Sequence, residues 1–302
     1  MNKSTKIWLI LASSLLFTGL IIFSTVMSLL NWDFTKLSTS KYQTTTHEVT
    51  EDFTNISINV DTADIEFFYT TDSKITVTTS EYENSTHLIK VEDNTLKIET
   101  TDNRKWYEHI SLFSLKPPKV SVYLPFGNYE KLSITSDTGD VKMPSDLNFS
   151  TIDIKSDTGD VINYASATDS IKIKTSTGDI RLEKISTNEI TIIVTTGDVK
   201  IKDVACKTFT SNGNTGDISL INVIVRDNLT IFRSTGDVEF HRCDADNIEV
   251  KTDTGDVEGS FVSSKIFITK TSTGDVDVPK TTSGGTCKIT TSTGDIEIDI
   301  RP

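Results

Sequence analysis

Aspartate is the residue whose type and spacing could most directly do chemistry in this sequence. The tripeptide Thr-Gly-Asp occurs nine times between residues 138 and 295, at intervals of 19 or 20 residues. Carboxylate oxygens are good ligands for hard cations. One interpretation is therefore a cation-binding ladder formed by the five central copies, Asp179, Asp198, Asp217, Asp237 and Asp256.

The competing interpretation of these aspartates is structural. Asp and Thr side chains accept hydrogen bonds from the backbone amides of turns, and nine near-identical copies suggest repeated turn chemistry. Tight calcium binding needs about six to eight oxygens that converge on one point, which a ladder does not supply. We therefore expect a structural role and predict no resident metal.

Other residue types that carry chemistry have no supporting pattern. The sequence contains three Cys and four His but no motif of a zinc protease, serine hydrolase, phosphate-binding loop or dinucleotide fold. Cys243 and Cys287 fall in apolar positions of the repeat, and Cys206 shares a position with Thr187 and Val225. We expect buried free thiols and predict no catalytic residue and no cofactor.

An aromatic cluster occupies an irregular insertion at residues 105–115. Trp106, Tyr107 and Phe113 lie there, and a proline pair follows. Exposed aromatic side chains on loops often contact partners, but such a cluster can also pack over the end of a core. Partner contact and core closure both stay open for these three residues.

The repeat indicates which elements position the aspartates. Apolar residues recur seven and five residues before each glycine and two and four residues after it, which predicts a strand on each side. The alternation changes phase at the glycine, and glycine tolerates the positive φ that a sharp corner requires. We assign this structural corner to Gly139, Gly159, Gly178, Gly197, Gly216, Gly236, Gly255, Gly274 and Gly294.

The period of the repeat predicts the fold class. One coil cannot bury its own apolar faces, whereas stacked coils bury continuous columns of Ile and Val. We predict an all-β protein with a single-stranded parallel β-solenoid (β-helix) at residues 131–302. Ile296, Ile298 and Ile300 are expected to form its last coil, with nothing after them to cover the open edge.

Residues 48–130 are less regular and are predicted to form an N-terminal β cap region. Six short strands are expected there, and Asp61–Ile65 resembles a corner in which Ala63 replaces the glycine. Terminal units of a repeat array must differ from the others to close the stack. The expected strands are 56–60, 65–69, 75–78, 88–91, 96–99 and 120–124.

The N-terminal segment predicts a membrane anchor. Residues 7–30 contain no charge, and a helix of that length spans roughly 36 Å, enough for the ~30 Å hydrocarbon layer. Both lysines of the segment precede the run, so residues 1–6 are expected to be a cytoplasmic tip and residues 31–302 extracytoplasmic. Residues 31–47 would be a tether. A cleaved signal peptide is the alternative, although the run is long and lacks a small-x-small site.

Net charge excludes one class of partner. The chain carries 30 Lys and Arg against 43 Asp and Glu, a net charge of −13. Because nucleic-acid binding needs a basic surface, we predict no nucleic-acid partner.

Several segments carry a resemblance to a known family. FTNISINVDTADIEFF, NTLKIET, KVSVYLP and the repeated TGDV corners resemble the putative-adhesin family of extracytoplasmic β-strand-repeat proteins, also called toastrack domains. The resemblance implies a Gram-positive envelope protein, often anchored and sometimes associated with cell-envelope stress systems. It supplies no catalytic residues.

The sequence therefore favours a non-enzymatic, single-pass membrane protein. Its expected role is cell-surface binding, adhesion or envelope-stress sensing, with an unknown envelope protein or glycan as partner. One alternative is a self-associating structural protein that forms a homo-oligomer through the solenoid end. A polysaccharide-acting solenoid enzyme is a weaker alternative, because coils that vary by one residue leave no cleft-forming insertions.

Overall fold

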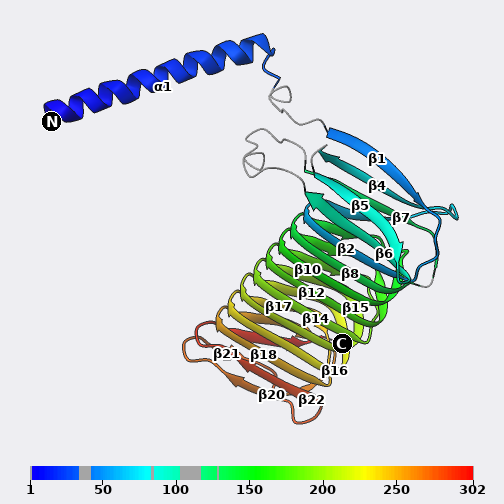
Figure 1. Ribbon diagram of the computed structural model, residues 1–302. Helices are drawn as coiled ribbons and strands as arrows, with labels where there is room; N and C mark the ends of the chain where they lie inside the picture. The colour runs from blue at the N-terminus through cyan, green and yellow to red at the C-terminus, as the bar shows by residue number, and fades with distance from the viewer. Residues whose placement is uncertain (1, 34–41, 83–84, 103–116, 128, 302) are drawn as a thin grey trace.

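The computed structural model describes residues 2–33, 42–82, 85–102, 117–127 and 129–301. Helix α1 (Lys3–Leu29) lies apart from a single long stack of strands (Figure 1). Within the described residues, α1 is the one helix long and apolar enough to cross a membrane, and its apolar side chains are almost all exposed. The apolar surface of α1 is therefore not covered by the rest of the described chain.

The strands of the N-terminal third include both parallel and antiparallel pairs. They are β1 (Tyr42–Val49), β2 (Asn55–Thr62), β3 (Asp64–Tyr69), β4 (Ile75–Tyr82), β5 (Ser85–Glu92), β6 (Thr95–Asp102) and β7 (Lys119–Leu124). Each of the six strands expected from the sequence is present. In addition, β1 begins at Tyr42, inside the segment 31–47 that was expected to be only a tether.

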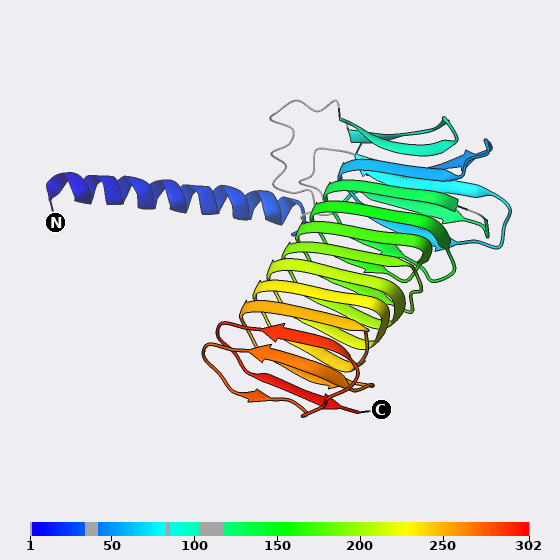
Figure 2. The ribbon, with the colours of Figure 1, turned by 90° about the horizontal axis from the view of Figure 1, so that it is seen from below.

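The strands of the repeat pair in parallel from coil to coil (Figure 2). They are β8 (Tyr129–Thr138), β9 (Val141–Met143), β10 (Asn148–Thr158), β11 (Val161–Asn163), β12 (Ser166–Thr177), β13 (Ile180–Glu183), β14 (Glu189–Thr196), β15 (Val199–Thr215), β16 (Ile218–Thr235), β17 (Val238–Cys243), β18 (Asn247–Thr254), β19 (Val257–Phe261), β20 (Lys265–Lys270), β21 (Val276–Asp277), β22 (Gly285–Thr290) and β23 (Ile296–Ile300). This confirms the predicted all-β solenoid.

The core consists of the apolar columns that the repeat predicts. Ile152 pairs with Ile171, which pairs with Ile190, and each is buried. The same succession continues through the whole stack, so one hydrophobic cluster runs from Phe53 to Ile298. Burial of apolar surface between coils, rather than within one coil, holds the fold together.

The N-terminal end of the stack is closed by antiparallel strands. The outermost coil consists of β6 and β7, which pair in parallel with β2 and β3. Beyond that coil, β5 pairs antiparallel with β6, β4 pairs antiparallel with β7, and β1 pairs antiparallel with β4. The cap region therefore contributes two coils to the stack as well as the strands that cover its edge.

The C-terminal end has a different order from the one expected. The coil of β22 and β23 pairs with β18 and β19 on one side and with β20 and β21 on the other. The last coil in sequence is thus the second coil from the end, and the prediction that Ile296, Ile298 and Ile300 form the open edge is wrong. The open edge consists of β20 and β21, because the chain passes outward to them and then returns to fill the gap.

Candidate functional site

The corner glycines are required by both backbone conformation and close packing. Their φ angles lie between 124° and 146°, a region that side chains disfavour. A Cβ built on Gly197 would lie 2.1 Å from the carbonyl oxygen of Gly178 in the preceding coil. A larger residue would therefore push two coils apart, which explains why the chain places glycine at every corner.

The aspartates bond to one another through the backbone. Each carboxylate of the row except that of the outermost Asp275 accepts, through Oδ1, the backbone N–H of the aspartate in the next coil, as Asp217 does from Asp237 at 2.8 Å. Nine such bonds, of 2.7–3.1 Å, join ten aspartates. In spatial order these are Asp64, Asp140, Asp160, Asp179, Asp198, Asp217, Asp237, Asp256, Asp295 and Asp275.

This carboxylate ladder satisfies backbone donors that the corner would otherwise leave without a partner. It also includes Asp64, beside the degenerate corner at Ala63, and it follows the spatial order of the last coils. In the part of the chain that the structure describes, no three His, Cys, Asp or Glu residues gather as a cation-binding group would require. The geometry gives the aspartates a stacking role, and the cation interpretation stays a prediction for experiment.

The three cysteines are buried and free. Burial raises the pKa of Cys206 and of Cys287 to about 12 and that of Cys243 to about 11. A thiol with such a pKa is protonated at neutral pH and is a poor nucleophile or metal ligand. The cysteines therefore act as small apolar side chains.

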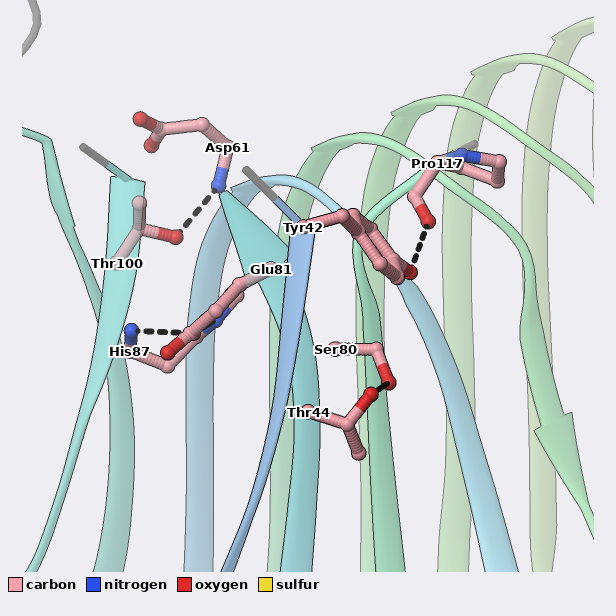
Figure 3. A network of polar contacts seen from close by, with 8 residues as sticks. All are labelled: Tyr42, Thr44, Asp61, Ser80, Glu81, His87, Thr100 and Pro117. Carbon is pink, nitrogen blue, oxygen red and sulfur yellow. Dashed lines mark hydrogen bonds and ion pairs between the residues drawn. The ribbon is translucent and has the colours of Figure 1, made fainter. Parts of the chain in front are cut away.

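Polar contacts lie among the antiparallel cap strands and the first coils (Figure 3). Glu81 of β4 accepts, through Oε2, hydrogen bonds from the backbone N–H of His87 at 2.9 Å and pairs with its Nδ1 at 2.7 Å. The side chains of Glu81 and His87 are only 5% and 2% exposed. Nearby, the Tyr42 hydroxyl donates to the carbonyl of Pro117. The predicted contact residues Trp106, Tyr107 and Phe113 lie outside the described residues.

Neither the Glu81–His87 pair nor the buried Arg233 was predicted from the sequence. Arg233 occupies an inward position where most other coils have Ser or Thr, and Gly213 in the adjacent coil makes room for its guanidinium group. Arg233 donates to Ser211 Oγ at 2.9 Å, while burial lowers the pKa of Arg233 to about 10. Residues 213 and 233 both differ from the residue types usual at this position of the repeat. Only the packing shows that the two residues are in contact.

The open end exposes an apolar side chain that is buried in the other coils. Val276 is 44% exposed, whereas its counterparts two residues after the other corner glycines are 0–1% exposed. Ile266 and Ile268, on the outward-facing side of β20 beside Thr286 and Lys288 of β22, are 41% and 56% exposed. No strand of the described chain pairs with the outer edge of β20 or β21, so this end has unpaired backbone groups beside an apolar surface.

Comparison with known proteins gives a family and a fold. The sequence profile of Toastrack DUF4097 matches residues 53–222 and again 196–302. The chain belongs to the Toastrack family. The family supports a non-catalytic surface module, and no curated protein matches the chain.

Two crystal structures share the Toastrack fold of this chain. A putative adhesin from Bacteroides fragilis has 15% identity and a TM-score of 0.50, covering 86% of this chain and 97% of its own. A putative adhesin from Parabacteroides merdae has 14% identity and a TM-score of 0.51, covering 86% of this chain and 96% of its own. Identities this low establish the fold alone.

Proposed function

We propose that this Toastrack protein is a membrane-anchored, non-enzymatic binding module on the extracytoplasmic side of the membrane, serving adhesion or envelope sensing. The proposal rests on the direction of the stack, whose closed end lies near the anchor and whose open end lies far from it. The eight residues between Asp33 and Tyr42 reach at most about 28 Å, so the closed end stays near the anchor. The open end lies about 45 Å away along the stack, at ~4.8 Å per coil.

Chemical features of the described residues support a binding role over catalysis. The three thiols are protonated, and the repeated aspartates are engaged with backbone amides. Uniform coils instead present long, regular outer surfaces suited to an extended partner. The two structural neighbours are described as adhesins, which supports adhesion as one form of this binding role.

Protease treatment of intact protoplasts tests the orientation. With Lys3 and Lys6 inside, added protease should remove the stack and leave a fragment that contains α1. Full protection would contradict the proposal, and release of the stack without protease would show that the segment is a cleaved signal.

Photo-crosslinking in cells tests the binding role. The anchored full-length chain should enrich a discrete envelope component, relative to a control in which α1 carries an unrelated β protein. Equal recovery with both anchors would contradict a binding module. The comparison removes the membrane as an explanation, because both chains carry the same helix.

The open end favours a second candidate function, self-association with a second copy of this chain. A two-fold axis would pair β20 antiparallel with its copy, matching unpaired backbone groups and covering Ile266 and Ile268. Among the described strands, β4 and β5 cover the coil at the closed end, so this pairing would end at two copies.

Sedimentation of the full-length protein in detergent tests this pairing. The wild type should form dimers in a concentration-dependent manner, and Ile268→Lys should remain monomeric. Ile193→Lys is the matched control, since Ile193 is 39% exposed in the middle of the stack. A wild-type monomer at all concentrations, or equal loss in both variants, would contradict self-association.

A further inference from the structure

A groove runs along the stack where the third side of each coil leads into the next strand. Residues eight to ten positions after the corner glycines line it, so successive coils contribute equivalent positions. One stretch of about 600 Å³ continues into another of about 420 Å³, and Arg226 borders both. Its buried floor consists of the small side chains Ala167, Thr187, Cys206, Val225 and Ala245.

The rims of the groove are polar and exposed. Ser186 and Asn188 provide a hydroxyl and an amide, while Lys207 and Arg226 follow on the next two coils. The floor residues Cys206 and Val225 are paired in the parallel register, and the register shifts directly after them, so Lys207 lies opposite Arg226 and Asp227 of the neighbouring coil. Asp246 lines the groove on the coil after Arg226, so a ligand would meet hydrogen-bonding groups, then two positive charges and, on the following coil, one negative charge.

The two cations are not neutralised within the protein. In the described ranges, neither Lys207 nor Arg226 forms an ion pair, although Asp227 directly follows Arg226. The contrast lies farther along the groove, where Lys265 is buried and pairs with Asp244 and Ser263. Two like charges side by side repel each other, and an anionic group between them would relieve that repulsion.

We propose that this groove binds a linear, hydroxyl-rich polymer that carries phosphate or carboxylate groups. The groove extends over roughly 30 Å at ~4.8 Å per coil, which suits an extended chain rather than a compact ligand. Hydroxyl and amide side chains on the rim contact the polymer's hydroxyls, and Lys207 with Arg226 contacts one anionic group. The inference deepens the proposed binding function by assigning it a ligand class.

The negative overall charge of the protein restricts anion binding to this groove. Outside residues 1–30 the chain carries 28 basic and 43 acidic residues, so 28 − 43 gives −15. A polyanion is repelled by most of such a surface, and Lys207 with Arg226 provides the local attraction in the groove. Neutralising the two cations should therefore weaken binding strongly.

Binding of labelled oligomers to the full-length protein in detergent tests the proposal. Three probes are used: a glycerol-phosphate oligomer, a hyaluronate oligomer and neutral dextran of similar length. The double variant Lys207→Gln, Arg226→Gln should bind the anionic probe at least about tenfold more weakly, because charge-assisted hydrogen bonds are lost. The matched control Lys172→Gln, Lys200→Gln removes two charges outside the groove and should bind within about twofold of wild type.

Each outcome decides the inference. Preference for the phosphate or the carboxylate oligomer identifies which anionic group the groove takes. Equal binding of dextran, equal weakening in both double variants, or no wild-type binding of either anionic oligomer would overturn the groove as an anion site. None of these results alters the protoplast or crosslinking tests, so failure of this inference is distinct from failure of the proposed function.

Discussion

The two ends of the stack solve the same topological problem but leave different surfaces. At each end the outermost coil is an internal excursion of the chain, β6–β7 at one end and β20–β21 at the other. At the first end, β4 covers β7 and leaves Val120 fully buried. At the other end nothing in the described chain covers β21, and Val276 is 44% exposed. A closed end needs extra antiparallel strands, and only the anchor-proximal end has them.

The difference shows how a solenoid manages its edges. A bare parallel edge invites further strands, so proteins cover it, shorten it or place charge and proline on it. The N-terminal end uses covering strands. The C-terminal end uses a short β21, with Pro279 soon after it, and the exposed Lys270 at the end of β20. The open end is therefore only partly protected, which suits a surface that meets a partner.

The largest effect is expected from removing the last coil. Truncation after Ser283 deletes β22 and β23, the only strands paired with β20 and β21 in the described chain. Hydrogen exchange should then show loss of protection at residues 265–277 as well as at the new end. Full protection there would mean that β20 and β21 re-pair with β18 and β19, and that the observed order is not fixed.

Substitution of a central corner should cost more than substitution of the outermost corner. Gly197→Val places a side chain against Gly178 O and forces an unfavourable φ, for a loss of about 3 kcal/mol or more. Gly274→Val meets Gly294 O similarly, but the outermost coil can detach without disrupting others. Denaturant unfolding measures both, and equal losses would contradict independent behaviour of the outer coil.

Each end also has one buried pair of an acidic and a basic side chain, and breaking the pair at the closed end should cost more. Glu81→Ala removes the acceptor for two donors of His87, a loss of about 3 kcal/mol. Lys265→Met leaves Asp244, which is 20% exposed and can be hydrated, so the loss should be smaller, about 1 kcal/mol. Unfolding midpoints in denaturant compare the two, with Glu81→Gln as the conservative control.

A matched pair of valines isolates the effect of covering an end. Val120→Ala should destabilise the protein by about 2 kcal/mol, because the side chain is buried between β3 and β4. Val276→Ala should cost less than about 1 kcal/mol, because much of that surface already contacts solvent. A large loss at Val276 in dilute protein would contradict an open end, whereas a loss seen only at high concentration would support self-association.

The smallest effect is expected from calcium. Since each ladder carboxylate already accepts a backbone N–H, millimolar calcium should change the melting temperature by less than about 1 °C. A reproducible calcium-specific increase of about 2 °C or more, abolished by Asp198→Asn, Asp217→Asn and Asp237→Asn together, would instead establish the cation ladder.

Much of the fold was predictable because the same information is repeated many times. The corner glycines, the alternating strands and the two main apolar columns each recur in successive coils, so chance irregularities in one coil do not obscure them. The chemistry of the lateral surfaces of the solenoid was less apparent from the sequence. Lys207 and Arg226 looked like ordinary surface charges until the stacking placed them on neighbouring coils beside one groove.

The sequence by itself determined the coil: its length, its glycine corner and the residues that face inward, because these depend on local backbone geometry and on a fixed period. Only the tertiary structure decided the order of the coils at the C-terminal end. Every coil offers nearly the same columns to its neighbours, so pairing in sequence order and the observed order use similar contacts. The choice rests on small differences: Cys287, Ile289, Ile296 and Ile298 are all buried between two coils, while Thr269 and Val276 occupy the partly solvated outer coil. The coil that loses the least apolar burial when it is exposed lies outermost. This order depends on comparing two coils that are distant in sequence, so neither coil encodes it alone.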